Sequence, residues 1–258
     1  MVGPLALSLN SADPELREWG AELCSGSSGV PLRSTEVTIQ LTHEALHGPP
    51  APELTSTELA YHGWRARRTA GGYFATLSVA GDPERRGPRR LATLLRVVAE
   101  AELGDIALAF HGAALVRDGG AWLFPGPRGA GKTTLARELP AATRLGDDHA
   151  LVVRHAGGWT VHPTPFPGRE GLRSEAAAAP LRAVALLGQA TVSEATRVTP
   201  AEAVSRLIPL VVRAGRDHQR ALDLVAQLCD EVPVLSLSRR LGDDPIDALA
   251  PALLEHAR

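Results

Sequence analysis

Alternation of apolar and polar residues predicts strands in the first third of the chain. Residues 35–41 (Thr-Glu-Val-Thr-Ile-Gln-Leu) alternate as in a half-buried strand. Two more strands, expected at 58–69 and 73–79, flank Gly71-Gly72, a pair that is typical of a hairpin turn.

Helical periodicity is strongest after Pro88, and the pattern ends before Gly104. Its apolar stripe consists of Leu91, Leu94, Leu95 and Val98. Further helices are expected at 13–19, 200–211, 217–229 and after Asp244-Pro245, the second of them bent at Pro209. Asp13 and Thr199 have the residue types and positions of helix N-caps.

Short apolar runs predict buried strands in the remainder of the chain. They lie at 106–116, 122–124, 150–154, 159–162, 183–187 and 232–237. Because these strands alternate with helical segments, the sequence indicates an α/β protein.

Composition and charge argue against some classes of protein. Apolar residues make up 44% of the 258 residues but aromatic residues only 4%, so leucine, valine and alanine must form the core. A net charge of −2 gives no basic field that would favour nucleic acid. No apolar run approaches the ~18 residues of a transmembrane helix and no secretory signal is evident, so we expect a cytoplasmic protein that does not bind membranes. Cys24 and Cys229 lack metal-site spacing and are expected to be buried thiols.

One segment carries the most specific chemistry. Of the 27 lysine and arginine residues only Lys132 is a lysine, and it lies in the sequence Gly-Pro-Arg-Gly-Ala-Gly-Lys-Thr-Thr at 126–134. This segment fits G-x-x-x-x-G-K-[ST], the P-loop pattern of nucleotide-binding proteins. A compact ammonium fits between phosphate oxygens, where a planar guanidinium is too wide. The expected strand at 122–124 and the expected helix from Thr133 give the order strand, loop, helix that the motif requires.

The motif predicts how a nucleoside triphosphate is held. The nucleotide-binding residues are expected to be Gly126, Arg128, Gly129, Ala130, Gly131, Lys132, Thr133 and Thr134. Loop N–H groups and the start of the following helix would surround the β-phosphate, Lys132 would reach the β- and γ-oxygens, and Thr133 would give Mg²⁺ a hydroxyl ligand.

Acidic residues follow the P-loop helix as Asp147-Asp148. One carboxylate there can hold Mg²⁺, and its neighbour can accept the proton of an attacking hydroxyl. The same tetrapeptide, Leu-Gly-Asp-Asp, recurs at 241–244, where we expect only a helix cap. His111 lies on the strand before the P-loop, and a strand histidine by itself is more often a packing residue than a catalytic one.

Together these segments resemble the C-terminal domain of HPr kinase/phosphorylase, which phosphorylates a seryl hydroxyl on a small carrier protein. The similar segments are 111–116, the turn at 118–120, the P-loop and 145–148. Stand-alone relatives in peptide natural-product clusters, including lasso peptide clusters, are also similar at Gly158-Trp159 and at 164–168. The resemblance is good over 105–170, loose over 180–240 and absent from the first 90 residues.

By this resemblance Lys132 binds phosphate, Thr133 and Asp147 lie at the Mg²⁺ ion, Asp148 is the base toward the acceptor hydroxyl, and His111 orients the aspartate pair. The resemblance also implies ATP as the nucleotide and homo-oligomeric rings, although no sequence feature distinguishes ATP from GTP or specifies an interface.

The chain departs from the family after the aspartate pair. The family carries a Glu-x-Arg-Gly-x-Gly-like segment whose glutamate binds metal, whereas 161–170 reads Val-His-Pro-Thr-Pro-Phe-Pro-Gly-Arg-Glu. This difference weakens any expectation of phosphorylase activity and of HPr as the substrate. Glu170 is a candidate replacement for the metal ligand, and Arg169 or Arg173 for a transition-state cation, but all three also fit a surface loop.

The sequence therefore predicts an α/β fold with an HPr-kinase-like P-loop core at 91–258. A smaller α/β lobe at 1–90 could add strands to the same sheet and could recognise the substrate. We expect an ATP- and Mg²⁺-dependent kinase acting on a serine of a peptide or small protein. The alternatives are a nucleotide-dependent switch without an acceptor and a kinase for a small-molecule hydroxyl.

Overall fold

The computed structural model of the protein describes residues 5–24, 31, 33–47, 53–54, 58–81, 83–139, 143–166, 174–212 and 218–254. These residues form two compact units, an amino-terminal unit that ends at Asp105 and a carboxy-terminal unit that begins at Ile106. The structure is mixed α/β, as the sequence predicted. None of the helices in the described ranges is both long enough and apolar enough to cross a lipid bilayer.

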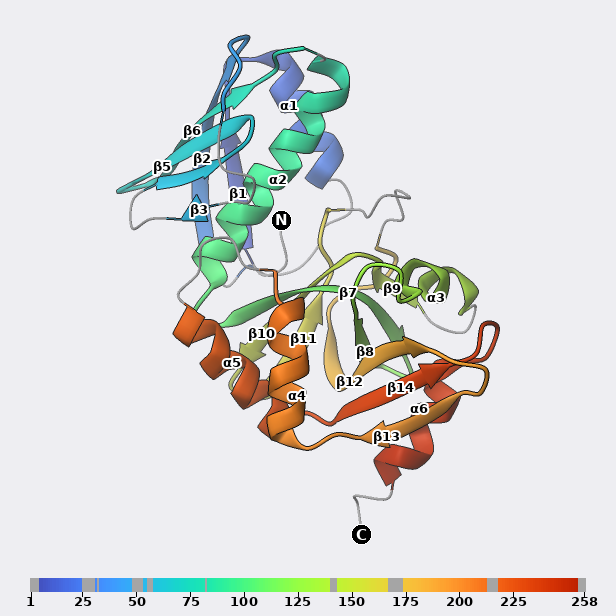
Figure 1. Cartoon of the computed structure of the whole chain (residues 1–258). Helices are drawn as coiled ribbons and strands as arrows, with labels where there is room; N and C mark the ends of the chain where they lie inside the picture. The colour runs from blue at the N-terminus through green and yellow to red at the C-terminus, as the bar shows by residue number, and fades with distance from the viewer. Residues whose placement is uncertain are drawn as a thin grey trace. The chain divides into compact units, whose positions relative to one another are not determined.

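In the described residues, the amino-terminal unit consists of a six-stranded sheet and two helices. Its elements are β1 (Leu5–Asn10), α1 (Pro14–Cys24), β2 (Arg33–Thr42), β3 (Glu53–Leu54), β4 (Glu58–Tyr61), β5 (Trp64–Thr69), β6 (Gly72–Ser78) and α2 (Pro83–Leu103). The strand order is β1-β2-β6-β5-β4-β3, with β1, β2 and β6 parallel and the other pairs antiparallel. Both helices lie on one face of this sheet (Figure 1), where Val37, Ile39 and Leu77 are buried.

The amino-terminal unit corrects several details of the sequence analysis. Its strands form a sheet of their own and do not extend the P-loop sheet. The single strand predicted at 58–69 is two strands, because the chain turns at Gly63, whose φ of 93° favours glycine. Helix α2 begins at Pro83, where a missing N–H costs nothing, and not at Pro88, which lies inside the helix.

The boundary between the units follows from the packing of α2. The sequence placed the boundary after residue 90, whereas the structure assigns all of α2 to the amino-terminal unit. Leu91, Leu94, Leu95 and Val98, the stripe predicted from periodicity, are completely buried. Because α2 contacts β1, β5 and β6, this stripe completes the core of the first unit.

The carboxy-terminal unit contains an eight-stranded sheet in its described part. Its elements are β7 (Ala107–Arg117), β8 (Gly120–Pro125), α3 (Lys132–Glu138), β9 (Thr143–Gly146), β10 (His149–His155), β11 (Gly158–His162), β12 (Ala179–Gln189), β13 (Glu194–Arg197), α4 (Pro200–Leu207), α5 (His218–Glu231), β14 (Val234–Arg239) and α6 (Pro245–Leu254). The strand order is β11-β10-β7-β8-β12-β14-β13, and β9 pairs with β7. Strands β8, β12 and β14 are parallel neighbours.

Helices cover both faces of this sheet (Figure 1). One apolar cluster joins α4 and α5 to β7 and β10, and another joins α3 and α6 to β8, β12 and β14. The caps predicted from sequence are present, since Thr199 Oγ1 accepts the N–H of Glu202 and Asp244 Oδ1 accepts that of Ile246. The bend predicted at Pro209 is instead the end of α4, which continues as one 3₁₀ turn at Ile208–Leu210.

Candidate functional site

The site is built on the middle of β7, at His111 and Gly112. On one edge of β7, Gly112 lies opposite Pro125, the last residue of β8, and Gly126 N donates to His111 O at 3.3 Å. On the other edge, Gly112 N donates to the carbonyl of Asp148 at 3.1 Å. Because β7 pairs with β9 and then with β10 along that edge, the aspartate pair between them lies at the level where the P-loop leaves β8.

The P-loop has the backbone that its glycines allow. Gly129 and Gly131 have φ angles of 86° and 94°, in the left-handed region that side chains with a Cβ disfavour. A Cβ added at Gly126 would lie 3.0 Å from the Cβ of Ala130, so the loop is tightly closed at its base. The predicted helix follows directly, since α3 begins at Lys132.

Lys132 is folded back onto the loop. Its Nζ donates to the carbonyl oxygens of Gly126 and Pro127, both at 2.9 Å, and the residue is only 6% exposed. Burial lowers the pKa of Lys132, and the charge of Asp148 opposes that shift. The influence of Asp148 on the pKa shows that the ammonium and this carboxylate act on one another across the site.

The two aspartates have different surroundings. Asp147 is 2% exposed, whereas the side chain of Asp148 is 43% exposed. His111 Nδ1 lies 3.1 Å from both the carbonyl oxygen and Oδ1 of Asp148. Both partners are acceptors, so Nδ1 carries the proton and holds the Asp148 carboxylate in place.

The surroundings of this histidine favour its neutral form. Burial is the largest effect and lowers the pKa of His111; Asp148 raises this pKa, while Lys132 and His149 lower it. His149 is the cross-strand neighbour of His111 in β10, and its ring contacts Phe166 edge-to-face with centroids 5.9 Å apart. A neutral His111 donates one hydrogen bond to Asp148 without adding a second full charge to the site.

Side chains that the sequence analysis did not identify support the P-loop from the neighbouring strands. Gln189, the last residue of β12, donates its Nε2 proton to Gly129 O at 2.9 Å. Arg239, the last residue of β14, is buried and pairs with Glu138 of α3 at 2.7 Å. No local pattern could have indicated these roles, because they depend on β12 and β14 following β8 in the sheet.

The donor chemistry of the site fits Mg²⁺. The predicted ligands, the Thr133 hydroxyl and the Asp147 carboxylate, are the hard oxygen donors that Mg²⁺ prefers. Within the described ranges, no group of three or more histidine, cysteine or acidic residues could hold a metal without further ligands. A Mg²⁺ ion here would therefore be shared with phosphate oxygens, which is the usual arrangement for this ion. The other predicted groups, Arg169, Glu170 and Arg173, lie outside the described residues.

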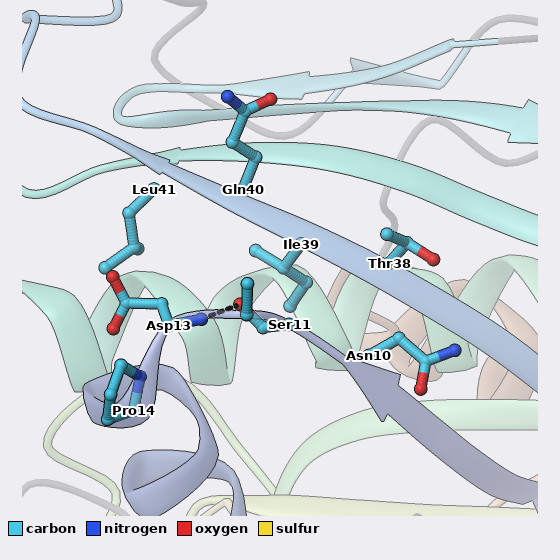
Figure 2. Close-up of a pocket in the computed structure, with 9 residues that line it drawn as sticks. Asn10, Ser11, Asp13, Pro14, Thr38, Ile39, Gln40 and Leu41 are labelled. Carbon is cyan, nitrogen blue, oxygen red and sulfur yellow. Dashed lines mark hydrogen bonds between the residues drawn. The ribbon is translucent and has the colours of Figure 1, made fainter.

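The amino-terminal unit has a pocket of its own, of about 810 Å³. It is lined by residues 10–14 between β1 and α1 and by residues 38–41 of β2 (Figure 2). Ser11 Oγ accepts the N–H of Asp13, and the Asp13 carboxylate caps α1 by accepting the N–H of Glu15 at 2.9 Å. These polar groups hold the helix start in place, so we assign the pocket no chemistry.

Comparison with known proteins gives one family. Residues 90–215 match the family model described as SynChlorMet cassette protein ScmC. The match spans slightly less than half of the chain and includes β7, the P-loop, the aspartate pair and Gln189. The region of the candidate site is therefore similar to a cassette-associated family. No curated protein matches the chain. The resemblance to HPr kinase/phosphorylase stays a prediction from the sequence motifs.

Proposed function

We propose that the protein is a phosphotransferase that binds ATP with Mg²⁺ at the P-loop and transfers the γ-phosphoryl group to a hydroxyl. The observation that carries this proposal is the convergence on His111-Gly112 of the P-loop, which holds Lys132, and of Asp148. A phosphate-binding loop alone would fit any nucleotide-binding protein. An exposed carboxylate oriented beside it supplies the group that a transfer to an alcohol requires.

In the proposed reaction Lys132 exchanges its loop carbonyls for oxygens of the β- and γ-phosphates. The acceptor oxygen forms a bond to the γ-phosphorus while the bond to the ADP oxygen breaks, and the acceptor proton passes to the carboxylate of Asp148. His111 positions this carboxylate through Nδ1–H. Phosphoryl transfer needs little covalent chemistry from the protein, so alignment and charge compensation provide most of the rate enhancement.

Thr133 and Asp147 are the proposed protein ligands of Mg²⁺. When bound, the ion would neutralise charge on the phosphate oxygens. Asp147 is 2% exposed, so an ion held by its carboxylate would be shielded from bulk water.

The acceptor we propose is a serine of a peptide or small protein, as in the kinases that the motifs resemble. The match to a cassette protein indicates where to search for the acceptor, because the products of one gene cassette commonly act on each other. Short peptides and carrier proteins encoded beside this gene are therefore the acceptors to test first.

Replacing Asp148 with asparagine tests the proposal. We expect Asp148→Asn to keep Mg²⁺-dependent ATP binding but to lose transfer by about 10²–10⁴-fold, the usual contribution of a general base. Phosphopeptide formation is measured by mass spectrometry, and ATP binding by calorimetry.

The repeated tetrapeptide at 241–244 provides a matched control. Asp244→Asn makes the same chemical change at a residue that caps α6 and pairs with Arg117, so this variant should transfer phosphate normally. Equal turnover in Asp148→Asn and wild type would remove Asp148 as the base. ATP hydrolysis that no hydroxyl compound affects would favour the switch, and transfer to a small alcohol but no peptide would favour the small-molecule kinase.

A further inference from the structure

Two large apolar side chains are exposed on adjacent turns near the P-loop. Val192, between β12 and β13, is 68% exposed, and Leu241, between β14 and α6, is 71% exposed. A single exposed leucine needs no explanation, because much of any protein surface is apolar. Two such residues on neighbouring turns beside a nucleotide-binding motif suggest a ligand surface.

Hydrogen bonds hold the two turns together. Ser193 Oγ donates to Asp243 Oδ2 at 2.7 Å and accepts the N–H of Arg240 at 3.0 Å. Within the second turn, Asp243 N donates to Arg240 O at 3.2 Å, and Gly242 has a φ of 91°. A glycine in this conformation at the third position of a tight turn fixes the second position at the corner, and Leu241 occupies that corner.

Both turns are also connected to the P-loop. Val192 lies three residues after Gln189, which binds Gly129 O, so it lies within about 11 Å of that residue along the chain. Leu241 lies two residues after Arg239, which binds Glu138 of α3. The turns follow the carboxyl ends of β12, which is parallel to β8, and of β14, which is parallel to β12. Figure 1 shows both turns at the same end of the sheet as α3. In open α/β sheets, ligands bind outside the carboxyl ends of the strands.

We propose that Val192 and Leu241 form the surface on which the base of a purine nucleotide lies while its phosphates occupy the P-loop. This inference rests on the proposed function. The phosphate cradle is polar and charged, whereas the face of a purine is flat and apolar and needs an apolar contact of this kind. The hydrogen bonds hold together the two turns that carry these side chains without the nucleotide, so little ordering of the backbone is required on binding.

The test compares ATP with inorganic tripolyphosphate, which has the phosphates without the base. In the double variant Val192→Ala/Leu241→Ala, calorimetry with Mg²⁺ should show ATP binding weakened by about tenfold or more and tripolyphosphate binding unchanged. Both side chains are exposed, so the double variant should unfold at the wild-type temperature. Leu222→Ala, which truncates an exposed leucine on α5, is the matched control and should bind both ligands normally.

Each other outcome contradicts a specific proposal. Unchanged ATP affinity in the double variant, or an equal loss for ATP and tripolyphosphate, would overturn the base-binding surface and leave the P-loop proposal intact. Wild-type protein that binds neither ligand would overturn the proposed function together with this inference.

Discussion

At the scale of single residues, burial affects two ionisable groups of the candidate site in the same way. Lys132 and His111 both have lowered pKa values because their surroundings desolvate the protonated forms. Asp148 favours the protonated form of each and partly restores it. The three groups therefore form one electrostatic set, in which removing the Asp148 charge lowers the pKa of both partners.

His162 provides a prediction about stability and pH. Burial, with a smaller effect of His155, lowers the pKa of His162 from 6.5 to about 4. Below pH 6.5 the unfolded chain binds a proton at His162, whereas the folded chain does not bind it until the pH is near 4. The contribution of neutral His162 to the free energy of unfolding is therefore present above pH 6.5 and is lost as the pH falls toward 4. We expect the loss to be about 2–3 kcal/mol, and His162→Gln to abolish it.

Urea unfolding at pH 7, 5.5 and 4 measures this effect. His43→Gln, at an exposed histidine, is the matched control and should follow the wild type. If His162→Gln and wild type lose the same stability between pH 7 and 4, then His162 is not the group responsible.

At the scale of elements, the sequence predicted the structure correctly wherever that structure depends only on residues close together in the chain. The caps at Asp13, Thr199 and Asp244, the strand at β2 and the strand–loop–helix order of the P-loop were all predicted and are present. These features depend on residues within a few positions of each other. The sequence therefore located the loop of the candidate site in full.

Features that depend on distant partners were missed. Strands β9 and β13 are only four residues long, so their existence depends on pairing with β7 and β14. The role of Gln189 could not be predicted for the same reason, because only the order of the strands in the sheet brings this residue to the P-loop. The His111–Asp148 contact was expected only from a family resemblance. His111 lies on β7 and Asp148 lies between β9 and β10, and the pairing of both strands with β7 brings the two residues together.

The contact between α1 and α2 provides a prediction at this scale. A Cβ at Gly87 of α2 would lie 2.2 Å from the ring of Trp19 of α1, so the indole would have to move. The gain in helix propensity from Gly87→Ala is at most ~1 kcal/mol, and overpacking costs about 1–3 kcal/mol. We expect a net destabilisation of about 1–2 kcal/mol in urea unfolding.

Gly71→Ala is the control for this variant, because nothing lies within 4 Å of a Cβ at that position. It should unfold within about 0.5 kcal/mol of the wild type, the range of ordinary surface substitutions. A Gly87→Ala variant as stable as Gly71→Ala would show that the helices do not pack through this contact.

At the scale of the whole molecule, the chain forms two compact units, and each unit has its own sheet. The match to the cassette family begins at residue 90, so the six-stranded sheet lies outside it. The proposed chemistry lies entirely in the carboxy-terminal unit. That the amino-terminal part could recognise the substrate stays a prediction.

The most direct test of the account is Mg²⁺-dependent ATP binding measured by calorimetry on wild-type protein, Lys132→Met and Lys132→Arg. We predict that the wild type binds and that both variants lose at least about 100-fold in affinity, because methionine lacks the charge and arginine is too wide for the cradle. A wild-type chain without Mg²⁺-dependent affinity for ATP, or a Lys132→Met variant that binds it equally well, would contradict the account.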